Sequence, residues 1–271
     1  MADNYWAERL ATAQSNLTEK SVRKVERQLA KYYEQTAKNI IGQFEKTYLK
    51  VMVGNYEGVK PTPADLYKLD SYWKMLAECK AELEKFGNKQ QRLLGKSFIN
   101  QYQQIYEVIS LPTDLSFGKI DKSALEQIIN QIWCSDGESW SSRIWKNIER
   151  LQDTLTEGLL DCLVAGKSPN ALKHELQKRF NVSFSNADMI VRTEMSHLQT
   201  QAAQKRYQDS GIEWVEVLAD KDERRCKVCG KLHQQRFPVN GQMPVPAHPR
   251  CRCCVIPVVG DYNEQMIMDG F

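Results

Sequence analysis

Cys-Lys-Val-Cys at residues 226–229, followed after 18 residues by His-Pro-Arg-Cys-Arg-Cys-Cys at residues 248–254, determines how the C-terminal part of this 271-residue chain folds. Two residues between paired cysteines let one tight turn direct both side chains at the same ion, and zinc prefers four sulfur and nitrogen donors in a tetrahedron. A loop of this length closes such a site at a modest entropic cost. The predicted metal ligands are Cys226, Cys229, His248 and Cys251.

Three thiolates and one imidazole leave no open position for water, so the pattern indicates a structural zinc ion rather than a catalytic one. The identity of the fourth ligand stays open. Cys251 and Cys253 lie two residues apart on an expected strand, which places both side chains on one face, so Cys253 could replace Cys251. The side chain of Cys254 is expected to point away from the face that Cys251 and Cys253 share. Free buried thiols are the simpler interpretation, but two paired half-sites rarely arise together by accident.

Composition narrows the class of protein further. The chain has 37 Lys and Arg against 34 Asp and Glu, and 42% of its residues are apolar, which argues against a disordered chain and against a polybasic nucleic-acid coat protein. It has no apolar run of the ~18 to 20 residues that span a membrane and no signal pattern at its start. Five of its eight cysteines lie between residues 226 and 254, so we expect a soluble, cytosolic protein with reduced thiols.

Upstream of the cysteines the sequence has helical periodicity. The first fifty residues contain no proline and one glycine, Gly42, and apolar residues recur every three or four positions from Val22 to Val51. This pattern predicts one long helix, capped at Thr18 or Ser21. The Gly- and Pro-containing segment 54–63 should end it.

Further helices and short strands follow from the same signals. The expected helices are 69–86, 89–110, 123–133, one through 144–162 that stops at Gly166, one that begins at Ser168-Pro169, and one from Ser185 to about Asp209 that Gly211 ends. The expected strands are 212–218, 236–239 and 252–259. We therefore predict a mainly α protein, with a body of long bundled helices and a small β-rich, zinc-stapled C-terminal knob at residues 212–259 (α+β). The predicted domains are 1–184, a helical body that docks partners, and 185–271, which carries the metal motif.

The knob region is basic. Residues 221–254 contain eight Lys and Arg and two Asp and Glu, a difference of +6, which three thiolates and a zinc dication reduce by one. Such a charge favours contact with a polyanion, while a solvated basic face is the alternative. The candidate DNA contacts are Arg224, Arg225, Lys227, Arg250 and Arg252.

These motifs resemble the phage Mu F-like head morphogenesis, or minor head protein, family. The residues that carry the resemblance are Asp220-Lys-Asp-Glu-Arg-Arg-Cys226-Lys-Val-Cys229, His248-Pro-Arg-Cys251-Arg-Cys253, Arg192-Thr193-Glu194, the helix end Tyr207 to Gly211, and the opening Asn4-Tyr5-Trp6 with Leu17-Thr18-Glu19-Lys20. Residues 185–258 are the most specific part. Arg192 and Glu194 could pair with the knob or be simple surface charges.

The resemblance implies a minor capsid protein of a tailed bacteriophage that associates with the portal vertex during procapsid assembly and assists DNA packaging or delivery. Its partners would be the portal protein and capsid or scaffold proteins, with double-stranded DNA as a further candidate and no membrane. It would be located in the virion, in the capsid interior or at the portal vertex, and in the host cytoplasm during assembly. No catalytic residue is predicted.

Two other functions compete with this one. A metal-dependent nuclease of the His-Asn-His type also has paired cysteines and a histidine, but it needs a free histidine base and further ligands for a catalytic ion. Once His248 binds zinc, only His233 is nearby. His174 and His197 lack a Ser, Cys or Asp at catalytic spacing. A zinc-containing DNA-binding regulator lacks a recognisable recognition helix.

Overall fold

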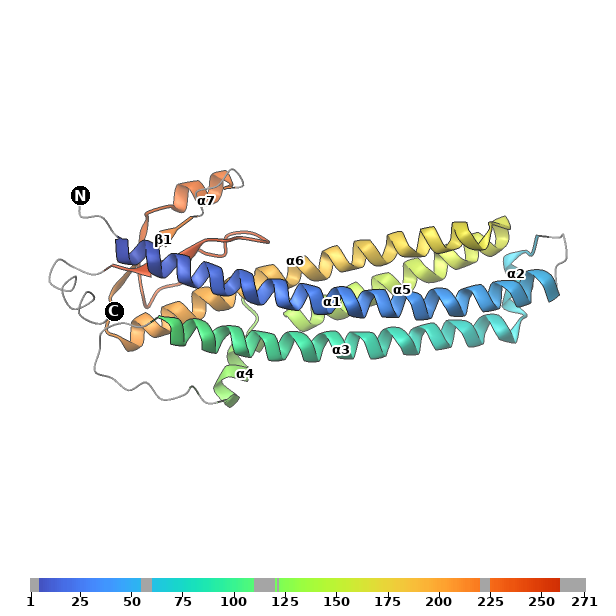
Figure 1. Cartoon of the computed structure of the whole chain (residues 1–271), viewed down its shortest axis with the longest axis horizontal. Coiled ribbons are helices and arrows are strands. Elements are labelled where there is room, and N and C mark those ends of the chain that lie inside the picture. Colours follow the sequence, from blue (N-terminus) through green and yellow to red (C-terminus); the bar gives the residue numbers. More distant parts are fainter. Residues whose placement is uncertain (1–4, 55–59, 110–119, 121, 220–224, 259–271) are drawn as a thin grey trace. The chain divides into compact units, whose positions relative to one another are not determined.

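A computed structural model describes residues 5–54, 60–109, 120, 122–219 and 225–258. The helices are α1 (Tyr5–Gly54), α2 (Pro63–Tyr67), α3 (Asp70–Val108), α4 (Lys122–Asn130), α5 (Trp140–Ala165), α6 (Pro169–Asp209) and α7 (Lys227–Leu232). The strands are β1 (Trp214–Leu218), β2 (Arg236–Pro238) and β3 (Cys254–Pro257) (Figure 1). The predicted fold class is confirmed: long helices dominate, and a small antiparallel sheet follows them.

The chain forms two compact units. The sheet-containing unit comprises Met1–Val25, Leu94–Trp133 and Met189–Phe271, and the bundle unit comprises Glu26–Leu93 and Cys134–Asp188. Helices α1, α3 and α6 each contribute to both. The division at residues 184 and 185 that the sequence predicts stays a prediction.

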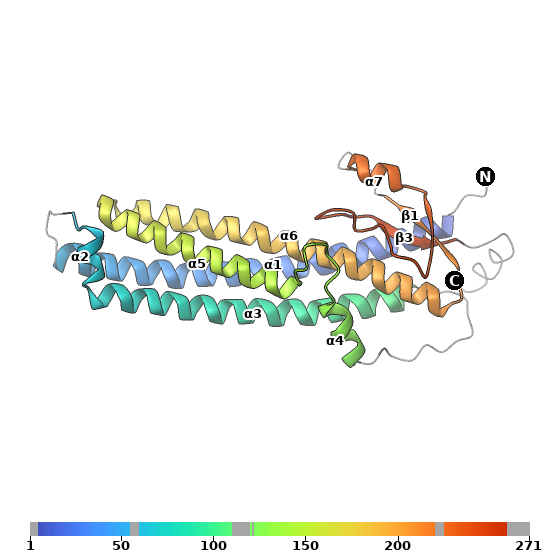
Figure 2. The same ribbon diagram turned by 180° about the vertical axis from the view of Figure 1, so that it is seen from behind.

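In the bundle unit, segments of α1, α3, α5 and α6 run side by side (Figures 1 and 2). The predicted stripe of α1 is buried from Val22 to Tyr48. A polar layer crosses this core: the Tyr33 hydroxyl lies 3.1 Å from the carbonyl oxygen of Ser183, and the Asn147 amide donates to the same oxygen at 2.8 Å. Burial raises the pKa of Tyr33 to about 12, because the phenolate would lose its hydration.

Two predicted helix starts are wrong. Helix α1 starts at Tyr5 and passes through Thr18 and Ser21; the Thr18 hydroxyl accepts a hydrogen bond from the Gln101 amide at 2.6 Å instead of capping the helix. Helix α6 likewise passes through Ser185, because the sequence from 170 to 209 contains neither glycine nor proline to stop it.

Helix α3 is one helix where the sequence suggests two, 69–86 and 89–110. Gly87 lies inside it, and a Cβ atom at this position would come within 2.6 Å of the Trp145 ring. The glycine therefore marks a close approach of α3 and α5 rather than a helix end. Trp73 on this helix is 53% exposed, whereas its neighbours Tyr72 and Met75 are buried.

Other helix ends lie where the sequence places them. Gly166 caps α5 with φ +63°, and Gly211 follows α6 with φ +74°, the left-handed conformation that glycine adopts readily. The Ser168 hydroxyl accepts a hydrogen bond from the backbone N–H of Ala171 at the start of α6. These ends fix where the chain leaves α6 for the sheet.

The sheet has the order β2-β1-β3, with both pairs antiparallel. Strands β1 and β3 are labelled in Figure 2. Val215 and Val217 on the central strand are buried, and every residue of β3 is buried. The carbonyl oxygen of Val255 accepts hydrogen bonds from the Tyr207 hydroxyl at 3.2 Å and the Gln14 amide at 3.4 Å. Helices α6 and α1 therefore satisfy a polar group of β3 within the sheet-containing unit.

Candidate metal centre

The first cysteine pair lies at the start of α7. Cys226 is the N-cap residue of this helix, with extended backbone, and its Sγ accepts a hydrogen bond from the backbone N–H of Cys229 at 3.3 Å. The backbone N–H groups at a helix start have no partner in the helix and favour negative charge. This hydrogen bond lowers the pKa of Cys226, which favours the thiolate that a metal requires.

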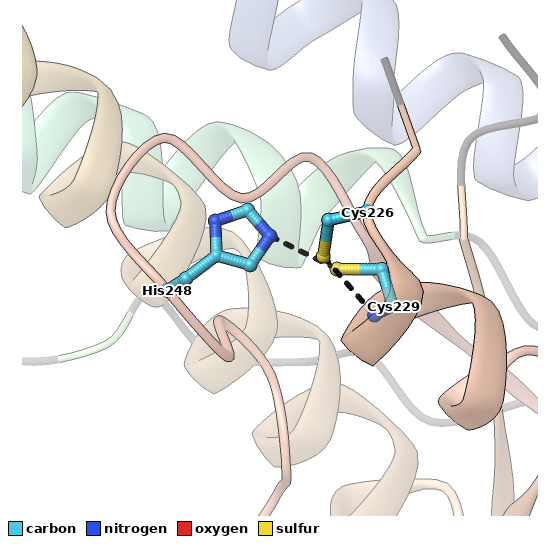
Figure 3. A group of neighbouring side chains, drawn as sticks. All are labelled: Cys226, Cys229 and His248. Carbon is cyan, nitrogen blue, oxygen red and sulfur yellow. Dashed lines mark hydrogen bonds between the residues drawn. The ribbon is translucent and has the colours of Figure 1, made fainter. Parts of the chain in front are cut away.

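The histidine of the second half-site faces this pair (Figure 3). His248 Nε2 lies 3.1 Å from the Sγ of Cys229, and His248 Nδ1 lies 2.8 Å from the carbonyl oxygen of Pro249. A carbonyl oxygen can only accept, so Nδ1 carries the hydrogen and donates it. The hydrogen bond to Pro249 raises the pKa of His248 and directs Nε2 toward the thiols, the arrangement that metal-binding histidines adopt.

Residues 248–251 form a tight turn. The backbone N–H of Cys251 donates to the carbonyl oxygen of His248 at 3.1 Å, and Arg250 has φ +60°. Proline at the second position and a positive φ at the third are features of a type II turn. This turn brings His248 and Cys251 to the same side.

The remaining thiols complete the cluster. Cys251 Sγ lies 3.7 Å from Cys229 Sγ, and the ligand atoms of Cys229, Cys251 and Cys253 all lie within 4.8 Å of one another. Cys226, Cys229 and His248 form a second such group, so Cys229 belongs to both. The structure therefore brings the four predicted ligands and the alternative Cys253 together around one thiol.

The thiols differ in their preferred protonation. A hydrogen bond from the Cys253 thiol lowers the pKa of Cys251 to about 5, and the same contact raises the pKa of Cys253. Burial raises the pKa of Cys229 to about 12. The contact between the two thiols thus favours the thiolate on Cys251 and the protonated form of Cys253.

The expectation that Cys251 and Cys253 lie on a strand is wrong, because β3 begins only at Cys254. Both still reach Cys229, since the irregular segment before β3 turns them to the same side. Cys254 is in neither donor group of the described residues. Burial raises the pKa of the Tyr207 hydroxyl, and the nearby Cys254 thiol adds to this effect.

The donor set fits zinc. Two thiolates on a tetrahedral zinc ion, each about 2.3 Å from the metal, lie about 3.8 Å apart. The observed separation of Cys229 and Cys251 is 3.7 Å. A thiolate and an imidazole nitrogen on the same ion lie about 3.5 Å apart, and Cys229 and His248 are within 0.4 Å of that value at 3.1 Å. Both printed separations are therefore close to those of two donors on one zinc ion.

Helix α6 contacts the second ligand turn and the segment that precedes it. The Thr193 hydroxyl donates to the carbonyl oxygen of Met189 at 2.7 Å and accepts from the backbone N–H of Arg250 at 3.1 Å. The Gln204 amide donates to the carbonyl oxygens of Val239 and Gly241, at 2.7 and 2.8 Å. Sequence reasoning missed both residues, because threonine and glutamine in the middle of a helix give no signal of a contact so far along the chain.

Arg192 and Glu194, beside Thr193, also have partners in the sheet-containing unit. Arg192 lies 3.4 Å from a carboxylate oxygen of Glu19 on α1, and Glu194 accepts a hydrogen bond from the Trp133 indole at 3.0 Å. Trp133 stacks on His197 with 4.1 Å between ring centroids. Burial lowers the pKa of His197 to about 4, so it is a neutral core residue.

The candidate DNA contacts lie around the metal cluster. Arg225, Lys227 and Arg250 are exposed, and Arg252 is half-buried. Arg224 lies outside the described residues. The other histidine of the region, His233, accepts a hydrogen bond from the backbone N–H of Ala219 through its Nδ1 at 3.3 Å and is in neither donor group of the described chain.

A comparison with protein families matches residues 152–256 to the family described as Phage Mu protein F like protein. The matched segment starts in α5 and contains all five donors of the cluster, so the resemblance inferred from the motifs is confirmed. No curated protein and no solved structure matches the chain. None of the described helices combines the length and the apolar character needed to cross a membrane.

Proposed function

We propose, from the premise that residues 152–256 are those of a phage Mu F-like head morphogenesis protein, that this chain is a minor capsid protein that associates with the portal vertex of a tailed phage. In this role it acts during procapsid assembly and assists DNA packaging or delivery. The observation that carries the proposal is that the matched segment contains the Cys and His motif, whose side chains the fold gathers into one cluster.

Copurification tests the portal association. The chain is expressed with the portal protein of its own phage, one of them tagged, and the complex is isolated on the tag. We expect the two proteins to elute together in a fixed ratio, and a tagged protein of similar size to capture neither. Full separation of portal and chain under conditions in which both are folded would contradict the proposal.

We propose that the metal is a structural zinc ion. Zinc contributes free energy of folding, with apparent binding free energies of about 10–16 kcal/mol in small zinc domains. Cys226, Cys229, His248 and Cys251 would hold it, with Cys253 beside them. These four residues would connect α7 to the segment before β3. Without the metal, only the short three-stranded sheet would hold these parts together. The proposed role of the ion is therefore to hold α7 against the segment before β3.

DNA contact by the knob is a further part of the proposal. Its support is the exposed cluster Arg225, Lys227 and Arg250 together with the basic sequence around it. Binding to a 30-base-pair duplex, a length of about 100 Å, is measured at several salt concentrations. Substitution of the three residues by glutamine should weaken binding and flatten its salt dependence, whereas glutamine at the exposed Lys31 and Lys85 should not.

We also propose that the protein is not an enzyme, because the expected donor set fills four positions of the ion. A nuclease would need a free base near the metal, and the Nδ1 atom of His233 already accepts a hydrogen bond from Ala219. Plasmid DNA should stay intact with the zinc-loaded protein in Mg²⁺ or Mn²⁺. Cleavage that is lost in His233→Ala would establish the nuclease instead.

A further inference from the structure

The bundle unit has a groove between α3 and α5, with a volume of about 510 Å³. The two walls differ in polarity: α3 contributes mainly apolar side chains, and α5 contributes polar and acidic side chains. The lining residues are Trp73, Leu76, Ala77 and Lys80 on α3 and Gln152, Asp153, Thr156 and Glu157 on α5. A volume of this size accommodates a few side chains of a partner.

Trp73 is exposed and yet held in one orientation. Its side chain is 53% exposed, while its indole N–H donates to the carbonyl oxygen of Tyr67 at 2.8 Å. The Trp73 ring also stacks on the ring of Tyr67, with 5.8 Å between centroids and 29° between planes. A large aromatic side chain that is already ordered loses little entropy when a partner covers it, which is a property of interface anchors.

The α5 side of the groove carries a row of carboxylates. Glu149, Asp153, Glu157 and Asp161 are all exposed, follow one another at intervals of four, and, within the described parts of the chain, have no ion pair. Like charges four residues apart destabilise a helix by about 0.2–0.5 kcal/mol per pair. Lys80 is the single basic residue of the lining, so the groove has a negative side that a basic partner would neutralise.

Helix α7 has the complementary surface. Lys227 and Lys231 are exposed and four residues apart, and Val228 between them is 54% exposed. Residues four apart on a helix have Cβ atoms about 5–6 Å from each other, so this pair of lysines has the same spacing as Asp153 and Glu157. Val228 with its two lysines on α7 therefore complements the groove, in which apolar side chains of α3 lie beside Asp153 and Glu157 of α5.

We propose that the groove between α3 and α5 binds α7 of a second copy of this chain. Val228 would lie against Trp73, and Lys227 and Lys231 would pair with Asp153 and Glu157. The two surfaces differ, so the contact is head to tail and each copy keeps one groove and one α7 available. This inference is independent of the proposed function. Because Lys227 is also a candidate DNA contact, the test uses protein free of nucleic acid.

Sedimentation velocity of the full, zinc-loaded chain measures the association. We expect the weight-average sedimentation coefficient to rise with protein concentration at low salt and to rise much less at about 0.5 M salt, where charges are screened. Trp73→Ala and the pair D153K/E157K should each weaken association at least tenfold. The pair E78K/E107K changes the net charge equally at exposed positions outside the lining and should associate as the wild type does.

Mixing two variants gives the decisive result. D153K/E157K lacks a working groove, K227Q/K231Q lacks the charges of α7 without creating a partner for the lysines of the altered groove, and each alone should stay monomeric. An equimolar mixture should form a one-to-one dimer and nothing larger, because only one intact groove and one intact α7 remain. A wild type that stays monomeric at all concentrations, or a mixture that stays monomeric, would overturn the proposal. Loss of portal copurification in D153K/E157K, with a monomeric wild type, would assign the groove to the portal instead.

Discussion

The hydroxyl group of Thr193 on α6 accepts a hydrogen bond from the backbone N–H of Arg250, the residue before Cys251 in the ligand turn. The same hydroxyl donates to the carbonyl oxygen of Met189, so both of its hydrogen-bonding directions are used. The middle residue of the Arg-Thr-Glu motif thus contacts the turn that carries two of the predicted ligands. This contact joins a helix motif and a metal motif that lie more than fifty residues apart in the sequence.

Replacing Thr193 by valine should weaken metal binding. Valine keeps the shape of the side chain but cannot accept from Arg250, so the turn with His248 and Cys251 loses its support on α6. Loss of such outer contacts typically lowers metal affinity about 10- to 100-fold. Competition with a chromogenic zinc chelator measures the change. Thr193→Ser keeps the hydroxyl and should bind nearly as the wild type does; equal affinities of all three proteins would show that this contact does not position the turn.

The two neighbouring cysteines should contribute unequally. Because the Cys253 thiol donates its hydrogen to Cys251, we expect Cys251→Ser to lose most of the bound zinc and Cys253→Ser to keep it. Zinc content after dialysis against a weak chelator is the measurement. The reverse order would make Cys253 the fourth ligand, and retention by both single variants but not by C251S/C253S would show that either one suffices.

Gly87 and Gly42 provide a matched test of packing in the bundle unit. A Cβ atom at Gly87 would lie 2.6 Å from the Trp145 ring, whereas at Gly42 it would meet no atom within 4 Å. Gly87→Ala should therefore lower the free energy of unfolding by about 1–3 kcal/mol through overpacking. Gly42→Ala should raise it by up to about 1 kcal/mol, because alanine favours the helix. Urea unfolding followed by circular dichroism compares them, and two changes of the same sign would contradict the close approach.

Tyr33 should make the bundle unit sensitive to alkali. Its pKa is about 12 in the folded protein and near 10 in the unfolded chain, so above pH 10 only the unfolded chain loses the proton. Stability is therefore intact below pH 10 and falls by about 2 kcal/mol as the pH rises to 12. Tyr33→Phe should be less stable at pH 7, where Ser183 and Asn147 lose a partner, but should lose less stability between pH 10 and 12. An unchanged pH profile would refute this assignment.

The sequence predicted the parts of the fold that depend on local chemistry. Apolar spacing identified the buried stripe of α1, and the caps at Gly166, Ser168 and Gly211 lie where glycine or serine has a local backbone role. Helix breaks were predicted wrongly where tertiary contacts override local signals. Thr18 receives a hydrogen bond from Gln101 within a helix, and Gly87 accommodates the Trp145 ring.

In the candidate site, too, the sequence predicted what depends on local spacing and missed the tertiary contacts. Cys-x-x-Cys and His-Pro-Arg-Cys identify donors from their spacing alone, because each pair is formed by one turn. From α6, Thr193 contacts the second of these turns and Gln204 contacts the segment between the two turns, and no sequence spacing reveals such contacts. The strand assignment of Cys251 failed for a related reason: the pairing of β1 with β3 starts at Cys254, and only the partner strand determines that start.

Elemental analysis of the purified, tag-free protein, with the variants Cys226→Ser and His248→Ala, tests the central claim most directly. We expect about one zinc per chain in the wild type and its loss in both variants, together with the tertiary signals of the three-stranded sheet. A wild type that is folded, contains no metal when purified without chelator, and has all five thiols of residues 226–254 free or oxidised would contradict the zinc-stapled knob.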